Sequence, residues 1–293
     1  MTDLREKINQ EGLIFDGAMG TMLMEKGLEQ GKPPEIFNLE NPEAVKSVHE
    51  SYISAGAEVI TTNTFGGTAL KLSKTELKGK QEEVNKVAVE IAREAAGGKV
   101  FVAGDIGPTG EMLKPFGLLD FEKAVDIFAE QASYLDEAGV DLFIIETIFD
   151  INEMLAAIKG VRTVSDKLLL ATMTFEKKPT GFFTIMGNSV PDCMEKALDE
   201  GADAVGANCS IGSDTMIELA RLIRKSVTSP VIIQPNAGVP EVKDGNIFYP
   251  ESADFFCDNI VKIKSLGVEI VGGCCGTNPA YTRCIAERIR GRS

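Results

Sequence analysis

Short apolar runs recur along the chain at regular intervals, and each is almost continuous rather than alternating. The eight runs cover residues 13–16, 58–62, 100–104, 142–146, 168–173, 204–208, 231–234 and 269–272. Continuous apolar runs of four to six residues are typical of parallel strands that are buried on both faces. The pattern therefore predicts eight strands of a parallel sheet.

A longer segment with helical spacing follows each apolar run. These segments cover residues 42–55, 81–96, 121–138, 152–164, 191–199, 214–227, 252–266 and 279–290. The first begins Asn41-Pro42-Glu43, which is a cap residue, a proline and an acid in the first turn, and it ends at Gly56. No Pro/Ser-rich linker or low-complexity tract interrupts the series. Eight strand–helix pairs without a boundary predict one α/β domain over residues 1–293, a single (β/α)8 TIM barrel.

Composition and charge narrow the classes of partner. The chain has 293 residues, 44% of them hydrophobic, which is enough for one large core. A net charge of −14 and the absence of a basic stripe argue against a nucleic-acid partner. The first ten residues are polar, and no apolar run approaches the ~18 residues of a membrane helix. We therefore expect a cytoplasmic protein without a membrane or nucleic-acid partner.

The cysteines supply the candidate chemistry. Six cysteines are too sparse for a disulfide scaffold in a chain of this length, and with one histidine any zinc site must be rich in sulfur. Cys274 and Cys275 follow the last apolar run and are flanked by glycines, which allow the chain to leave strand geometry so that both sulfurs can reach one ion. Cys209 ends another apolar run and is the best candidate for a third ligand.

Three thiolates leave a tetrahedral Zn²⁺ with one open position, which is the catalytic arrangement. Two other interpretations of the Cys274-Cys275 pair remain open at this point. The pair could be a strained disulfide, or it could be two buried thiols that pack as small hydrophobic groups.

The barrel places further polar residues near the same end. Active sites of this fold lie at the carboxyl ends of the strands, where inward side chains from alternate strands form layers. Cys209 and Cys274, after the sixth and eighth strands, can share a layer with Asn236 between them. The residues expected at this end are Asp16, Asn63, Thr64, Asp105, Glu146, Cys209, Asn236 and Cys274.

Motifs spread over nearly the whole chain carry a family resemblance. They are Phe-Asp-Gly-Ala-Met-Gly-Thr (15–21), Thr-Asn-Thr-Phe-Gly (62–66), Gly-Asp-Ile-Gly-Pro-Thr-Gly (104–110), Glu-Thr-Ile-Phe-Asp (146–150), Gly-Ala-Asn-Cys-Ser (206–210), Pro-Asn-Ala-Gly (235–238) and Gly-Gly-Cys-Cys-Gly-Thr (272–277). Together they resemble the homocysteine S-methyltransferase family, and the two cysteine motifs make the resemblance specific. Within the family the chain is most similar to the homocysteine-binding module of cobalamin-dependent methionine synthases and less similar to the betaine-dependent enzymes.

The resemblance implies roles for particular residues. Cys209, Cys274 and Cys275 are implied to bind Zn²⁺, with the homocysteine sulfur in the fourth place, and Asn236 is implied to lie near the metal and to cap the open position without substrate. The acids Asp16 and Glu146 are implied to hold the amino group of homocysteine. The remaining implied contacts are to its carboxylate, from the amides around Ala18 and Met19 with Thr64 nearby.

The implied reaction is methylation of homocysteine to methionine. Only the thiolate of a thiol is a good nucleophile, and coordination to zinc deprotonates it. The implied donor is methylcobalamin carried by a corrinoid protein or module, because no segment of this chain is expected to bind a corrinoid. Three alternatives remain: a small-molecule donor such as betaine or S-methylmethionine, a thiol-binding subunit without independent turnover, and a barrel whose cysteines serve redox chemistry.

Several residues have an interpretation that involves no chemistry. Acids such as Asp16 and Glu146 could cap the following helices. Asn63 and Asp105 are expected to organise loops, and His49 is expected to be a surface or packing residue. The remaining cysteines, Cys193, Cys257 and Cys284, are expected to be core thiols, and Met19, Met22 and Met24 are expected either to line the barrel mouth or to fill the core.

Overall fold

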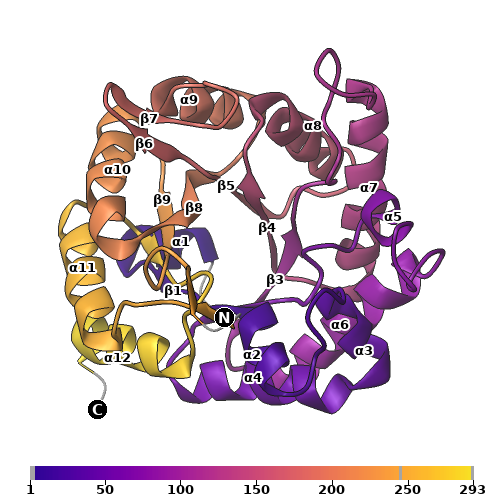
Figure 1. Ribbon diagram of the computed structural model, residues 1–293, viewed down its shortest axis with the longest axis horizontal. Coiled ribbons are helices and arrows are strands. Elements are labelled where there is room, and N and C mark those ends of the chain that lie inside the picture. Colours follow the sequence, from indigo (N-terminus) through magenta and orange to yellow (C-terminus); the bar gives the residue numbers. More distant parts are fainter. Residues whose placement is uncertain (1–3, 244–245, 292–293) are drawn as a thin grey trace.

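Eight parallel strands form a closed barrel in the computed structural model, which describes residues 4–243 and 246–291 (Figure 1). The strands are β1 (Leu13–Ile14), β2 (Val59–Thr61), β3 (Phe101–Ile106), β4 (Leu142–Ile148), β5 (Leu168–Met173), β8 (Ala204–Gly212), β9 (Val231–Asn236) and β12 (Ile270–Val271). They pair in the order β1-β12-β9-β8-β5-β4-β3-β2, and a bridge between Phe15 and Val59 joins β1 to β2. The predicted (β/α)8 TIM barrel is therefore confirmed.

Eight helices surround the barrel, and their ends agree with the predicted segments to within two residues. They are α4 (Pro42–Ser54), α6 (Gln81–Ala96), α7 (Phe121–Ala138), α8 (Ile151–Arg162), α9 (Val190–Glu200), α10 (Ser213–Ser226), α11 (Ala253–Ser265) and α12 (Pro279–Arg290). The Asn41 side chain accepts a hydrogen bond from the Ala44 amide and so caps α4 as its sequence predicts. None of the helices in the described part of the chain is long and apolar enough to cross a membrane.

Shorter elements that the apolar pattern did not predict lie mainly in the loops that follow the strands. They are α1 (Leu4–Gln10), α2 (Met19–Glu25), η1 (Pro34–Ile36), α3 (Phe37–Glu40), α5 (Ala69–Leu72) and the hairpins β6–β7 (Glu176–Lys178 and Gly181–Phe183) and β10–β11 (Glu241–Lys243 and Asn246–Phe248). These pieces are too short to show a clear hydrophobic period.

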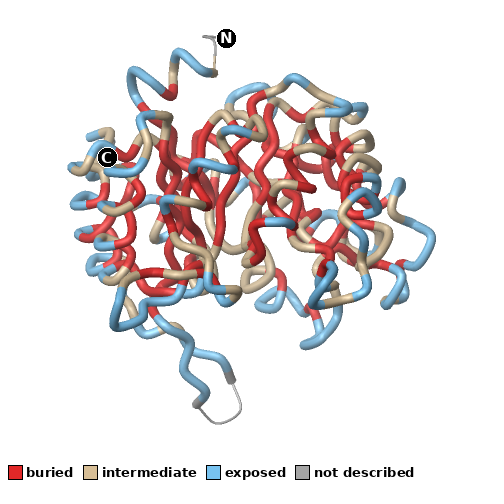
Figure 2. Tube along the Cα trace, turned by 90° about the horizontal axis from the view of Figure 1, so that it is seen from above, coloured by how far each residue is buried: buried red, intermediate tan, exposed pale blue. Residues whose placement is uncertain are grey.

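The barrel interior is a core of its own, separate from the layer between strands and helices. Alternate residues along the strands point inward, such as Leu13 on β1 and Phe15 just after it, or Leu142 and Ile144 on β4, and they form one buried cluster. Ile8 of α1 belongs to the same cluster, so α1 closes the amino end of the barrel. In Figure 2, α1 and the β10–β11 hairpin lie at opposite ends of the molecule.

The next inward position on most strands is polar. These polar residues are Thr61, Asp105, Glu146, Thr172 and Gln234, whereas on β8 Gly206 comes next and the polar residue Asn208 follows it. Asp105 and Cys209, predicted to follow their strands, lie inside β3 and β8, because parallel pairing continues beyond the apolar run. The alternation that fills the barrel with apolar groups therefore carries polar groups into its carboxyl end.

Two predictions about buried residues outside the site are confirmed and one is wrong. His49 on α4 and Cys193 on α9 are fully buried, as expected for a packing histidine and a core thiol. Cys257 and Cys284 are not separate thiols, because they pair as a disulfide between α11 and α12. Their Cα atoms lie 6.1 Å apart, a separation that the linear sequence does not reveal and that suits a disulfide.

Candidate metal centre and substrate pocket

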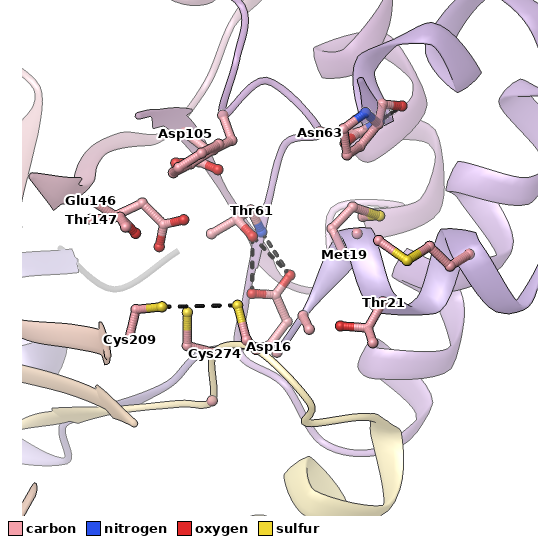
Figure 3. A pocket seen from close by; sticks show the side chains of 18 of the residues that line it. Asp16, Met19, Thr21, Thr61, Asn63, Asp105, Glu146, Thr147, Cys209 and Cys274 are labelled. Atoms are coloured by element: carbon pink, nitrogen blue, oxygen red, sulfur yellow. Dashed lines mark hydrogen bonds between the residues drawn. The ribbon is translucent and has the colours of Figure 1, made fainter. Parts of the chain in front are cut away.

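Three sulfur atoms converge at the carboxyl end of the barrel. The Sγ atoms of Cys209, Cys274 and Cys275 lie within 4.8 Å of one another, and those of Cys209 and Cys275 are 3.9 Å apart (Figure 3). Zn–S bonds of ~2.3 Å in tetrahedral geometry place two sulfurs about 3.8 Å apart. The three cysteines are free rather than disulfide-bonded, so their spacing and chemistry fit a zinc site with one open position.

The backbone leaves strand geometry at both cysteine motifs, by different means. β12 ends at Val271, so Cys274 and Cys275 lie in the turn beyond it, where Gly276 has φ of 81° and packs under the Tyr249 ring. On β8 the left-handed conformation falls on Cys209 itself, with φ of 58°. A non-glycine residue in this region is strained, which marks the position as one held by its surroundings.

The three thiols influence one another's ionisation. Hydrogen bonds from Cys274 and Cys275 lower the pKa of Cys209 to about 3. The same interactions with Cys209 raise the pKa of Cys274 above its usual range and that of Cys275 to about 12. The protein alone thus stabilises one thiolate with two thiols, and a bound cation is needed for all three to ionise.

Asn236 lies beside this cluster, at the end of β9. Its side chain helps to lower the pKa of Cys209, while its Oδ1 is buried with no hydrogen-bond partner among the described residues. A buried, unsatisfied oxygen costs stability. Its position next to three sulfurs is therefore consistent with a further ligand for a cation.

A cavity of about 690 Å³ opens above the sulfurs. Of the residues predicted from the sequence, Asp16, Ala18, Met19, Glu146, Cys209, Cys274 and Cys275 line it. Thr64 and Asn236 do not line it. The Thr64 hydroxyl instead donates to the Asp105 carbonyl at 2.7 Å. Met24 also lines the cavity, whereas Met22 packs against the core.

The two predicted carboxylates line this cavity, Asp16 buried and Glu146 partly buried. Burial raises the pKa of Asp16 to about 7, although its Oδ2 accepts a 2.8 Å hydrogen bond from the Thr61 amide. Burial, with Cys209 and Asp16 nearby, raises the pKa of Glu146 to about 8. Neither acid is the helix cap that the alternative interpretation required, because Ala18 and Asp150 occupy the N-cap positions of α2 and α8.

One residue that the sequence did not single out organises the site. Asn208 points inward from β8 and accepts hydrogen bonds at its Oδ1 from the Thr147 amide and the Thr172 hydroxyl. Its Nδ2 donates to Glu146 at 3.3 Å and to the Cys274 sulfur at 3.8 Å. Asn208 therefore connects Glu146 to the sulfur cluster. The inward alternation Ala204, Gly206, Asn208 was the sequence signal for it.

The two residues expected to organise loops behave differently. Asn63 does so, because its Nδ2 donates to the Pro34 carbonyl and to Asn38 Oδ1, both at 2.8 Å. The carboxylate of Asp105 does not, because its Oδ1 is buried without a hydrogen-bond partner among the described residues. The loop interpretation is therefore wrong for the Asp105 side chain.

Comparison with solved structures shows where this architecture recurs. The metallated form of the homocysteine methyltransferase MmuM from Escherichia coli superimposes with a TM-score of 0.79 at 22% identity, covering 95% of this chain and 96% of that chain. A methyltransferase from Methanosarcina mazei gives a TM-score of 0.64 at 10% identity over 98% of this chain and 97% of that chain. At these identities the likeness concerns the fold.

Sequence comparison identifies the family. Methionine synthases from Mycobacterium leprae and Mycobacterium tuberculosis are 30% and 29% identical to this chain over 98% of its length. The chain spans about a quarter of the length of these relatives, 25% in each case. The profile of the homocysteine S-methyltransferase family matches residues 13–289. Extending over almost the entire barrel and both cysteine motifs, this match shows that the chain belongs to the homocysteine S-methyltransferase family.

Proposed function

We propose that this chain methylates L-homocysteine to methionine at a zinc site formed by Cys209, Cys274 and Cys275. The observation that carries the proposal is the three-sulfur cluster facing a cavity with buried carboxylates. When bound, zinc would lower the pKa of the homocysteine thiol, so that the sulfur is held as the nucleophilic thiolate. The three cysteines would hold the ion, and Asn236 would cap its open position in the absence of substrate.

The chain's own residues would orient the substrate. Asp16 and Glu146 would accept hydrogen bonds from its ammonium group, and such charge-assisted bonds fix orientation as well as adding affinity. The backbone around Ala18 and Met19 would face its carboxylate. The Ala18 amide donates to Thr277 Oγ1 at 3.3 Å. The Thr64 hydroxyl already donates to the Asp105 carbonyl, and Thr64 does not line the cavity. Thr64 would therefore stabilise the loop beside the substrate rather than contact the substrate.

We propose methylcobalamin, carried by a corrinoid protein or module, as the methyl donor. The relatives named methionine synthase, of which the chain covers a quarter, support a partner module. Large apolar side chains are also exposed on the loops after the strands, the face that carries the cavity. They include Met24, Met112, Phe116, Leu118, Ile185, Val239, Val242 and Ile247. Exposed apolar groups gathered on one face favour a macromolecular partner.

A small cationic donor such as betaine or S-methylmethionine is the second candidate. The cavity is lined by five acids, Asp16, Glu25, Glu35, Asp105 and Glu146, and no lysine or arginine is among its described lining residues. An acidic wall favours a donor whose methyl group is carried on a positive centre. We further propose that residues 1–293 form one barrel domain and that the protein is cytoplasmic.

Zinc content and X-ray absorption test the metal and the acceptor together. We expect one zinc with three sulfurs, rising to four sulfurs when L-homocysteine is added. Cys209→Ser is expected to lose most zinc and at least 100-fold in methyl transfer, because a ligand to the ion is weakened. The matched control is Cys193→Ala, which removes a fully buried thiol away from the cavity. Full zinc and full transfer in Cys209→Ser would refute the proposal.

The donor is tested with the same protein. We expect transfer to homocysteine from free methylcobalamin and none from betaine or S-methylmethionine. Transfer only from a small cationic donor would replace the corrinoid part of the proposal. Binding of homocysteine without transfer from any of these donors would indicate a thiol-binding subunit. Turnover of a thiol–disulfide couple by zinc-free protein would support the redox alternative instead.

A further inference from the structure

Asp105 has a buried carboxylate whose Oδ1 accepts no hydrogen bond from the described residues of the protein. It lies near the end of β3, where its amide donates to Thr62 Oγ1 at 3.0 Å and its carbonyl accepts from Thr64 Oγ1 at 2.7 Å. These backbone interactions complete the local structure without the side chain. The side chain lines the cavity, the residue is only 6% exposed, and its Oδ1 has no hydrogen-bond partner among the described residues.

The surroundings of Asp105 disfavour the ionised form of its carboxyl group when no cation is near it. Burial, together with the nearby carboxylates of Glu146 and Asp16, raises the pKa of Asp105 well above its usual range. Lys71 partly offsets this effect, but its ammonium group lies 4.3 Å from the centre of the Phe65 ring and Lys71 does not line the cavity. A buried acid among other acids stays protonated unless a cation pairs with it, and no lysine or arginine among the described residues that line the cavity can do so.

The three acids differ in how much of their hydrogen-bonding capacity is free. Asp16 accepts from both the amide and the hydroxyl of Thr61, and Glu146 accepts from Asn208. Asp105 accepts from neither backbone nor side chain at Oδ1. Figure 3 shows the three side chains around the space above Cys209 and Cys274. A primary ammonium group has three N–H donors and no acceptor, so three carboxylates can satisfy it completely.

We propose that Asp105 is the third carboxylate contact of the substrate ammonium and makes the pocket selective for thiols that carry a primary amine. This inference rests on the proposed function, since it concerns the same acceptor. It adds a specificity-determining residue to the pair Asp16 and Glu146. The Asp105 carboxylate lines the cavity and accepts no hydrogen bond at Oδ1 from the described residues, so it would accept the third N–H. A thiol without the amine would gain nothing from Asp105.

The test compares two thiols on the zinc-loaded protein. L-homocysteine carries the amine, and 4-mercaptobutyrate has the same chain length and carboxylate without it. We expect Asp105→Asn to weaken homocysteine binding about 10- to 100-fold, the range for loss of a hydrogen bond to a charged group. The affinity for 4-mercaptobutyrate should change less than twofold, and zinc content should be unchanged. Both affinities are measured by titration calorimetry.

A matched control is Asp150→Asn, which alters a buried aspartate that does not line the cavity and caps α8. It should leave both affinities unchanged, because asparagine also caps helices. The inference would be overturned, and the proposed function left intact, if Asp105→Asn weakened the binding of both thiols equally or did not weaken the binding of homocysteine. Failure of the wild-type zinc protein to bind either thiol would instead overturn the proposed function, and the inference with it. Asp105→Ser supplies the same comparison if the asparagine variant folds poorly.

Discussion

At the scale of single residues, the site is built from groups that are costly to bury. Asp16, Asp105 and Glu146 all have raised pKa values because they are desolvated within one cavity. The Oδ1 atoms of Asp105 and Asn236 are buried without partners in the described structure. Such groups lower the stability of the ligand-free protein, and a cluster of them in a cavity is typical of a functional site.

The loss of stability caused by the buried Asp105 carboxyl can be measured through the dependence of the unfolding free energy on pH. A carboxyl whose folded pKa is raised binds its proton more tightly in the folded state, so stability falls as pH rises above the unfolded value of ~3.9. Asp105→Asn removes this pH-dependent contribution to the unfolding free energy. We expect its Tm to exceed that of the wild type by about 2–4 °C at pH 8, for a gain of roughly 1 kcal/mol, and by less at pH 5. An equal shift at both pH values, measured by calorimetry without substrate, would show that ionisation is not the cause.

At the scale of elements, the βα turns position the ligands more than the strands do. Cys274 and Cys275 are held in the turn between β12 and α12, where Gly276 lies under Tyr249. The Ala237 amide donates to the Cys275 carbonyl at 3.0 Å, and the Cys274 amide donates to the Pro235 carbonyl at 2.9 Å. These bonds tie the turn to the end of β9, so the geometry of the sulfurs depends on the close approach of two loops.

Substitution of Gly276 separates close packing from backbone strain. In Gly276→Ala the new Cβ overlaps the Tyr249 ring, and the positive φ adds a cost of about 1 kcal/mol. We expect this variant to lose at least half of its zinc. Gly98→Ala has a similar positive φ of 71° but no atom within 4 Å of the added Cβ. It should lose stability and keep its zinc, as determined by metal analysis after dialysis. Equal zinc loss in the two variants would show that strain alone is responsible.

At the scale of the whole molecule, the barrel separates stability from chemistry along its axis. The amino end is closed by α1, whose Ile8 is 2% exposed and packs into the barrel interior. The carboxyl end carries the polar layer, the sulfurs and the cavity. This division is general for the fold, since the loops at the carboxyl end can vary without disturbing the packed layers below.

Removing the α1 anchor should therefore affect stability alone. Ile8→Ala is expected to cost about 2–4 kcal/mol of unfolding free energy, because it opens a cavity in a packed interior. Zinc stoichiometry and homocysteine affinity should be unchanged. Asn9→Ala, an exposed position on the same helix, is the control and should change stability by less than about 0.5 kcal/mol. Loss of zinc in folded Ile8→Ala protein would contradict this separation.

The local pattern of the sequence determined the barrel and much of its site. Continuous apolar runs such as 168–173 are typical of a doubly covered parallel strand, and period-2 alternation sends Asp105, Glu146 and Asn208 to the inside. The cysteine motifs at Cys209 and Cys274 were visible because glycines and strand ends surround them. These features depend on neighbours within a few residues, which is the range that a sequence exposes directly.

Other properties were decided by contacts between residues far apart in the chain. Cys257 and Cys284 are paired because α11 and α12 pack together, and the Thr64 hydroxyl is withdrawn from the cavity because the Asp105 carbonyl accepts its hydrogen bond. The Asp105 carboxylate is left free because the backbone around it is already satisfied. Whether a polar group is satisfied depends on every partner that folding brings to it, so the sequence located the acids of the site and only the tertiary structure decided which of them is free.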